Sequence, residues 1–367
     1  MRLLLLASEG GDAQRRALHG LLASARARGD EVRMLAPDRE GKLLRDAGIP
    51  IESWQPGGLF HVLRSIGALR RALDRHVPDV IHALGWAAGA VVLGALPASA
   101  AARTVVTLLD PLREGEIPKA FVERRLPELL RRAAHVTCAY ETLAREVVER
   151  FGVAAEHVSV VPYGVAAALP PGAARTGDDG PIVGYAGGAE PERAWEIAFD
   201  AVASAQRTFP AAQLRIAAPG SAGTPLRAYA RGRDVRYDVV AVTDAGATAF
   251  FGAIDLLIVP QGRDGLPWAL LQALVDGVPV VGADRDGIGD TLRALGTGLL
   301  VDDDDAAFAQ GIVHTWSAIE GARREAQGRR AAAIAAFAPA QVAARMTTIY
   351  DRIAAAATSP IPLENDD

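Results

Sequence analysis

The chain has 367 residues, a formal net charge of −5 and a hydrophobic content of 50%. This length is enough for two domains of ordinary size, each with a core of its own. The acidic balance and the lack of a basic block in the sequence argue against nucleic acid as a partner. Cys138 is the single cysteine, so no intrachain disulfide can form. A reducing compartment fits this composition, and we expect a cytoplasmic protein.

The first half of the chain alternates between strands and helices. A strand at 2–7 precedes a helix at 12–28, which ends at Gly29, a residue suited to a helix C-terminus. Further strands are expected at 30–37, 49–53, 79–82, 103–108, 135–138 and 158–165. The helices between them are expected at 59–76, 86–96, 120–132 and 142–151. This alternation predicts a parallel sheet.

A second series of the same kind follows residues 166–180. That segment is rich in Pro, Gly and Ala, has no periodicity, and is interpreted as a linker. Strands are expected at 181–187, 213–217, 239–242, 256–259, 278–282 and 298–301, with a helix at about 191–209. A last long helix spans about 339–357, and the tail at 358–367 has a composition typical of disorder.

The predicted fold is therefore α/β, with two doubly wound, Rossmann-like domains that face each other across a cleft. The expected parts are a first domain at 1–165, the linker at 166–180, a second domain at 181–338, a helix at 339–357 that crosses back to the first domain, and the tail. The longest uncharged stretch, 83–102, is broken by Gly, Ala and Pro97 and is interpreted as a buried helix. The arginine-rich segment 63–75 is a candidate for peripheral membrane contact, although an ordinary surface helix is the simpler interpretation.

Several stretches of the second half form a pattern. They are PIVGYAGGAEPERAWEIAFDAV at 181–202, DLLIVPQGRDGLPWALLQALVDGVPVVGAD at 255–284, DGIGDTL at 286–292 and GTGLLV at 296–301. In this order and spacing they resemble the retaining GT-B glycosyltransferases of family 4, and VVTLLDP and VVPYGV in the first half agree. The resemblance implies a nucleotide-sugar donor, UDP- or GDP-linked, bound mainly by the second domain. It also implies an acceptor held mainly by the first domain, and catalysis without a tightly bound metal.

The resemblance assigns a phosphate-binding role to the first turn of the second domain. Arg193 stands where the family usually has a Lys that contacts the diphosphate, and a guanidinium can meet the charge of that leaving group. The family's companion Arg falls at Gly188, so one cation of the usual pair is missing. Gly187 and Gly188 can still offer backbone N–H groups. Gly10 and Gly11 occupy the turn in which the family lets substrate approach the backbone, with a plain tight turn as the alternative.

Asp264 and Gln272 fall on the family's two acidic positions, normally two Glu eight residues apart. Asp264 keeps the charge and is implied to lie near the transferred sugar. Gln272 replaces the Glu that accepts hydrogen bonds from ribose, and its carbonyl oxygen can still accept them. The alternative for Gln272 is an ordinary helix-face residue. Gly265 and Leu266, with Trp268, are expected to present backbone N–H groups to the donor, and Trp268 has core packing as its alternative.

Other polar residues have weaker assignments. Many relatives have a His before Asp110, but here the position is Leu109, and Asp110 either contacts sugar hydroxyls or serves as a cap or turn residue. His82 is interpreted as structural more readily than functional. Asp284 and Asp286 match a D-x-D metal motif of a different glycosyltransferase fold, and we do not expect them to bind metal. Asp290 is a candidate donor contact, and residues 302–305 are expected to cap a helix that begins near 306.

These assignments predict a retaining glycosyltransferase that acts on a sugar, lipid or small-molecule acceptor. The changed polar positions Leu109, Gly188 and Gln272 keep a second hypothesis open, a catalytically weak or inactive relative that binds a sugar nucleotide or glycan. A sugar-nucleotide epimerase is less favoured, because the recognised cleft positions are poor in acid/base carboxylates and histidines. The sequence leaves the oligomeric state open.

Overall fold

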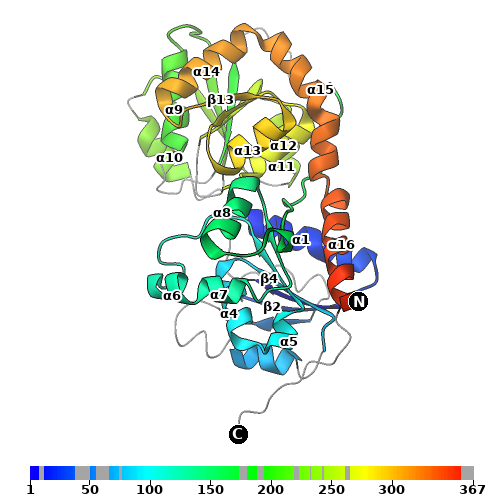
Figure 1. Cartoon of the computed structure of the whole chain (residues 1–367). Helices are drawn as coiled ribbons and strands as arrows, with labels where there is room; N and C mark the ends of the chain where they lie inside the picture. The colour runs from blue at the N-terminus through cyan, green and yellow to red at the C-terminus, as the bar shows by residue number, and fades with distance from the viewer. Residues whose placement is uncertain are drawn as a thin grey trace. The chain divides into compact units, whose positions relative to one another are not determined.

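The computed structural model of the chain describes residues 1–7, 12–37, 50–54, 66–73, 77–172, 180–187, 194–218, 223–231, 233–241, 244–260 and 265–356 (Figure 1). Contacts between residues divide the chain into two compact units. The first unit takes in residues 1–164 and the chain from 339 onward, and the second unit spans 165–338.

The first unit is built on a parallel sheet whose described strands have the order β3-β2-β1-β4-β5-β6-β7. The strands are β1 (Arg2–Ala7), β2 (Glu31–Ala36), β3 (Ile51–Ser53), β4 (Val80–Leu84), β5 (Thr104–Leu108), β6 (His135–Cys138) and β7 (Val158–Val160). Every residue of β4, β5 and β6 is buried. Continuous burial of this kind is typical of parallel strands that are covered on both faces.

The helices of the first unit agree broadly with the predicted pattern. Those with described bounds are α1 (Asp12–Ala27), α4 (Trp86–Ala95), α5 (Ala98–Ala101), α6 (Lys119–Arg124), α7 (Leu126–Leu130), α8 (Glu141–Phe151), the 3₁₀ turn η1 (Ala155–His157) and α16 (Pro339–Ala356). The helix predicted at 120–132 is wrong in one respect, because it is broken into α6 and α7. Pro127 lies in the first turn of α7, where its missing N–H costs no hydrogen bond, whereas inside one long helix it would break the ladder.

The uncharged stretch at 83–102 contains α4, whose residues are mostly buried, so its interpretation as a core helix is confirmed. Among the described residues, no helix combines the length and the apolar character needed to cross a bilayer. Of the arginine-rich segment at 63–75, only 66–73 is described, and it is helical. The tail at 358–367 lies outside the described residues.

The second unit repeats the architecture. Its described strands have the order β10-β9-β8-β11-β12-β13, and all of their pairings are parallel. They are β8 (Ile182–Ala186), β9 (Gln213–Ala218), β10 (Tyr237–Ala241), β11 (Leu256–Val259), β12 (Val280–Ala283) and β13 (Leu299–Val301). The helices are α9 (Ala194–Ala205), α10 (Gly223–Ala230), α11 (Asp244–Phe251), α12 (Trp268–Asp276), α13 (Asp286–Leu295), α14 (Asp305–Ser317) and α15 (Ile319–Phe337). The two doubly wound parallel sheets predicted from the sequence are therefore present.

The last helix, α16, belongs to the first unit, as the predicted crossover requires. It packs against α1 and β4, and Figure 1 shows it in red beside the blue α1. Its buried residues, Met346, Ile349, Tyr350 and Ile353, recur every three or four positions. This spacing is the apolar stripe of a helix that lies on a core.

Candidate functional site

The strand order of the second unit reverses between β8 and β11, which are paired in parallel. In open α/β sheets, ligands bind at the carboxyl ends of the strands that flank such a reversal. The predicted donor residues follow these two strands along the chain, at 187–193 and 264–272. The topology therefore places the carboxyl ends of β8 and β11, after which these residues come in the sequence, at one edge of the sheet. Of these, Gly188, Arg193 and Asp264 lie outside the described residues, as do Gly10 and Gly11 after β1.

Gly187 is placed differently from its predicted role. Its backbone N–H donates to the carbonyl oxygen of Ala217 at 3.1 Å, so this group is already used within the sheet. The expectation that Gly187 offers its N–H to phosphate is therefore corrected. A Cβ atom at this position would lie 2.8 Å from Cζ of Tyr185, so a close aromatic neighbour explains the glycine.

The approach to α12 is a buried turn. The carbonyl oxygen of Gly265 accepts from the N–H of Gly287 at 3.0 Å, which ties the start of α12 to the start of α13. Leu266 is 1% exposed, so its side chain belongs to the core. Trp268 meets Phe251 edge-on, with ring centroids 5.9 Å apart. Core packing, the alternative given for Trp268, thus describes its side chain.

Gln272 lies in the middle of α12 and is only 5% exposed. Its amide nitrogen Nε2 donates to the carbonyl oxygen of Ala166 at 2.8 Å and to Oδ2 of Asp276 at 2.9 Å. Both amide hydrogens are therefore used inside the second unit, and only Oε1 remains for a ligand. Asp276 was missed by the sequence reasoning, although a carboxylate four residues after a Gln on one helix is a recognised pairing.

At the matching edge of the first unit, Asp110 begins the loop after β5. Its carbonyl oxygen accepts from Nε1 of Trp86 at 2.9 Å, and its carboxylate lies 3.9 Å from the guanidinium of Arg113. The Asp110 side chain is 18% exposed, so it still reaches solvent. These contacts describe a turn residue and leave the sugar-contact role as a proposal.

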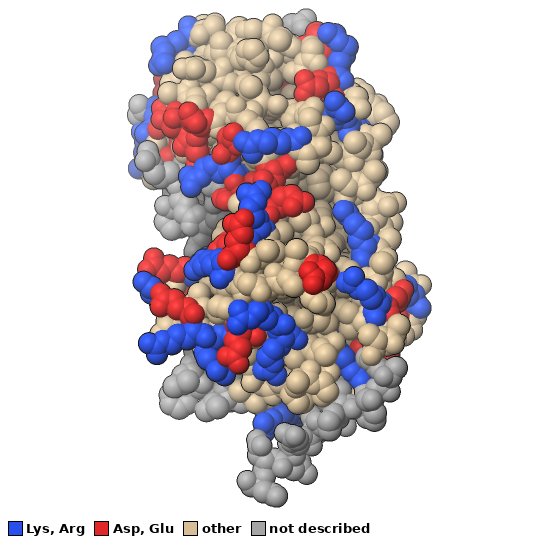
Figure 2. Space-filling model, in the orientation of Figure 1, with Lys and Arg blue, Asp and Glu red and all other residues tan. Residues whose placement is uncertain are grey.

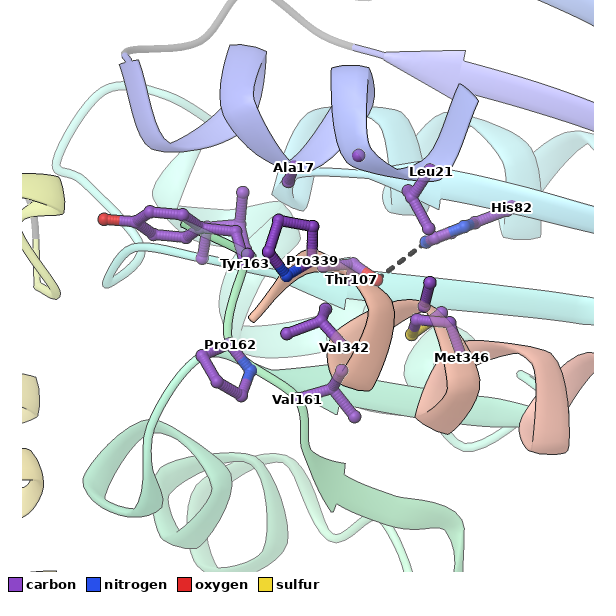
Figure 3. Close-up of a pocket in the computed structure, with 14 residues that line it drawn as sticks. Ala17, Leu21, His82, Thr107, Val161, Pro162, Tyr163, Pro339, Val342 and Met346 are labelled. Carbon is purple, nitrogen blue, oxygen red and sulfur yellow. Dashed lines mark hydrogen bonds between the residues drawn. The ribbon is translucent and has the colours of Figure 1, made fainter. Parts of the chain in front are cut away.

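Leu109 lines a small apolar pocket in the first unit, between α1, the sheet and α16 (Figure 3). The cavity is about 30 Å³, which suits a water molecule or two and not a sugar ring. Val161, Pro162 and Tyr163 approach it from the chain after β7, and Val342 and Met346 approach it from α16. The position that holds a His in many relatives is thus an interior, apolar position in this chain.

His82 lies on β4 at the floor of this pocket and is fully buried. Its Nδ1 is 2.5 Å from Oη of Tyr350. Its Nε2 is 2.7 Å from Oγ1 of Thr107, as the dashed line in Figure 3 shows. Oγ1 of Thr107 is in turn 2.5 Å from Oγ1 of Thr137, so these side chains form a chain of hydrogen bonds. Burial lowers the pKa of His82 to about 3, so the ring is neutral at ordinary pH. These partners bear out the structural interpretation of His82.

The acidic residues after β12 have local partners. Asp284 pairs with Arg293, and Asp286 begins α13 with a φ of 42°. Asp290 lies within the same helix. Asp304 caps α14 by accepting from the N–H of Ala307 at 2.8 Å, as expected for residues 302–305.

Within the described part of the chain, no three His, Cys, Asp or Glu side chains are grouped as metal ligands.

One face of the molecule carries charges of both signs. On the face shown in Figure 2, Lys and Arg are interspersed with Asp and Glu. This face of the molecule therefore presents no extended area of one sign, in keeping with the modest net charge of −5.

Comparisons with known proteins cover both units. Residues 13–164 match the family model described as a glycosyl transferase 4-like domain, and residues 180–318 match the model described as glycosyl transferases group 1. The D-inositol 3-phosphate glycosyltransferases of Acidothermus cellulolyticus and Pseudarthrobacter chlorophenolicus are 27% and 26% identical to this chain, over 286 and 275 residues. Each alignment covers 69% of this chain, but 63% and 65% of the respective relatives. The chain thus matches less than two thirds of the length of these curated relatives.

Solved structures share the architecture over nearly the whole chain. HepE of Anabaena, crystallised with UDP, has a TM-score of 0.75 at 18% identity, and the match covers 96% of this chain and 100% of HepE. Sucrose-phosphate synthase of Thermosynechococcus elongatus has a TM-score of 0.72 at 16% identity, with 97% and 100% covered. At such identities the likeness establishes the fold alone.

Proposed function

Because this chain belongs to the group 1 glycosyltransferases of family 4 and has their GT-B architecture, we propose that it transfers a sugar from a nucleotide-diphosphate donor to an acceptor hydroxyl. The observation that carries the proposal is the edge at which β8, β11 and the start of α12 meet in the second unit. HepE has been crystallised with UDP and with UDP-glucose, which supports a UDP-linked donor over a GDP-linked one. The curated relatives are named for inositol phosphate, which supports a small polyhydroxylated acceptor over a lipid.

We propose retention of the anomeric configuration by internal return. The bond between the sugar and the diphosphate breaks, and the acceptor hydroxyl attacks from the face that the diphosphate leaves. The departing phosphate oxygen takes the proton of that hydroxyl, so no strong protein base is needed. Arg193 and the backbone N–H of Gly188 would meet the developing charge. Asp264 would orient the transferred sugar, and Asp110 would contact sugar hydroxyls.

Arg193→Ala tests the phosphate assignment. We expect UDP, or GDP, to raise the melting temperature of the wild-type protein, because a ligand that binds only the native state stabilises it. We expect the variant to lose about 10²–10³-fold in kcat for transfer, as when one charge-stabilising group is removed from an active site. Arg233→Ala is the matched control. Arg233 lies just before the amino end of β10, and its guanidinium pairs with the carboxylate of Asp200. Transfer that is robust and equal in both variants would refute the assignment of Arg193.

The alternative is a relative that binds a sugar nucleotide without turning it over. It is favoured by the apolar position of Leu109 and by the use of the Gly187 N–H within the sheet. Calorimetry separates the two functions. Tight binding of UDP or GDP with neither transfer nor hydrolysis of UDP-glucose or a GDP-sugar would favour the binding protein.

A further inference from the structure

Gln272 and Asp276 lie one turn apart on α12, and the surroundings of Gln272 dictate which way its carboxamide points. The two atoms that face Nε2, the carbonyl oxygen of Ala166 and Oδ2 of Asp276, are both acceptors, at 2.8 and 2.9 Å. A carboxamide can satisfy two acceptors only with its NH₂ group. The oxygen Oε1 must therefore point away from Asp276.

Asp276 cannot move to relax this constraint. It is 1% exposed, and its other oxygen, Oδ1, accepts from the backbone N–H groups of Ala168 and Leu169 at 2.7 and 2.9 Å. Both carboxylate oxygens are thus occupied, by two backbone donors on one side and by Gln272 on the other. Because a buried acceptor that loses its donor is costly, Asp276 demands a donor at position 272.

A glutamate at position 272 would not meet this demand. Its carboxylate would face Oδ2 of Asp276 and the carbonyl oxygen of Ala166, with acceptors on both sides and two negative charges at hydrogen-bond distance. The glutamine is therefore more than a neutral substitute for the family's acid. It is the side chain that the neighbouring Asp276 requires.

We propose that Asp276 is a positioning residue of the donor site, which holds the Gln272 carboxamide with Oε1 outward as the acceptor for the ribose hydroxyls of the nucleotide. This inference rests on the proposed function. It goes beyond that function by giving Asp276 a role in donor binding and by requiring Gln, and not Glu, at position 272. Restoring the family's acid by Gln272→Glu is therefore expected to weaken donor binding.

Three variants test the pair: Gln272→Glu, Asp276→Asn and the two combined. The asparagine introduced by Asp276→Asn would keep an oxygen for Ala168 and Leu169 but would direct an NH₂ group toward position 272. Each single variant is expected to bind UDP about tenfold more weakly, which is the effect of one hydrogen bond. In the double variant the new NH₂ group faces the new carboxylate, although the carbonyl oxygen of Ala166 still opposes it, so part of the lost affinity should return. Affinity is measured by calorimetry with UDP, or with GDP if the melting screen selects it.

A second measurement separates ribose recognition from general damage. The ratio of the dissociation constants of 2′,3′-dideoxy-UDP and UDP reports the ribose hydroxyls, and it should shrink in both single variants. Arg330→Met is the matched control, because Arg330 donates to the carbonyl oxygen of Leu169 at 2.7 Å and holds the same segment without bonding to Gln272. We expect Arg330→Met to lower the melting temperature and to leave the ratio unchanged.

The outcomes are distinct. Undiminished UDP binding by Gln272→Glu, no recovery in the double variant, or an equal change of the ratio in Arg330→Met would each overturn the role of Asp276. A wild-type protein that binds neither UDP nor GDP would overturn the proposed function itself, and this result is obtained before any substitution is made.

Discussion

Asp255→Ala should lower the free energy of unfolding by about 3–5 kcal/mol, the loss typical of a broken buried ion pair. The Asp255 side chain is 0% exposed at the amino end of β11, and its Oδ1 accepts from the Arg323 guanidinium at 2.8 Å. Its Oδ2 accepts from the backbone N–H of Ile182 at 2.9 Å. The carboxylate therefore joins α15 to β8, and its removal leaves the Arg323 charge buried without this partner.

Glu320→Ala is the control for this loss. Glu320 binds the other arm of the same guanidinium, also at 2.8 Å, but its side chain is 71% exposed. An exposed partner of this kind contributes no more than about 1 kcal/mol. Urea denaturation of the two variants measures the difference, and the double variant Asp255→Ala with Arg323→Met should recover part of the stability because no charge is stranded. Equal losses for Asp255→Ala and Glu320→Ala would show that burial is not what makes the pair strong.

The sheets were predictable because parallel strands buried on both faces are short apolar runs, and β1 and β11 are clear examples in the sequence. Helix α15 was not predicted, and its composition explains why. Its sequence is dominated by Ala and Arg, and the few buried positions include Arg323 itself. A helix that is held to its unit partly by an ion pair has no apolar stripe for a periodicity argument to detect.

The candidate site was harder to predict, because its hydrogen bonds join residues far apart in the sequence. Gln272 was recognised as a polar residue at a ligand position, but its orientation depends on Ala166, 106 residues earlier. Residues 166–180 were interpreted as a linker from their composition, yet the backbone N–H groups of Ala168 and Leu169 donate to the carboxylate of Asp276. Local composition reports the lack of regular structure in such a segment and says nothing about its distant partners.

His82 should make the protein sensitive to acid, and His82→Gln should remove much of that sensitivity. Burial lowers the pKa of His82 from 6.5 to about 3 in the folded protein. Between these two values the unfolded chain binds a proton that the folded chain does not. The stability due to the neutral ring is therefore present above pH 6.5 and is lost as the pH falls toward 3. A shift of this size corresponds to roughly 4–5 kcal/mol over the whole window.

The substitution has a cost at neutral pH. Gln cannot reproduce both contacts of the ring, to Oη of Tyr350 and to Oγ1 of Thr107, so we expect about 1–3 kcal/mol less stability at pH 7. Below pH 6.5 the two proteins should converge, because only the wild type is penalised by protonation of an imidazole at this site. Carboxylates titrate alike in both proteins, as does His135, whose pKa burial lowers to about 4, so the difference between the two curves isolates His82.

Urea denaturation from pH 7 to pH 4 measures both curves, with His157→Gln as the control. His157 is exposed, and its Nδ1 lies 3.2 Å from the carbonyl oxygen of Ala134. The His157→Gln variant removes no buried ring, so its stability should stay within about 0.5 kcal/mol of the wild type across this range. A constant gap between wild type and His82→Gln from pH 7 to pH 4 would mean that His82 is protonated in the folded protein. In that case both ring nitrogens would donate, to Oη of Tyr350 and to Oγ1 of Thr107, and the chain of hydrogen bonds that joins α16 to the sheet would persist in acid.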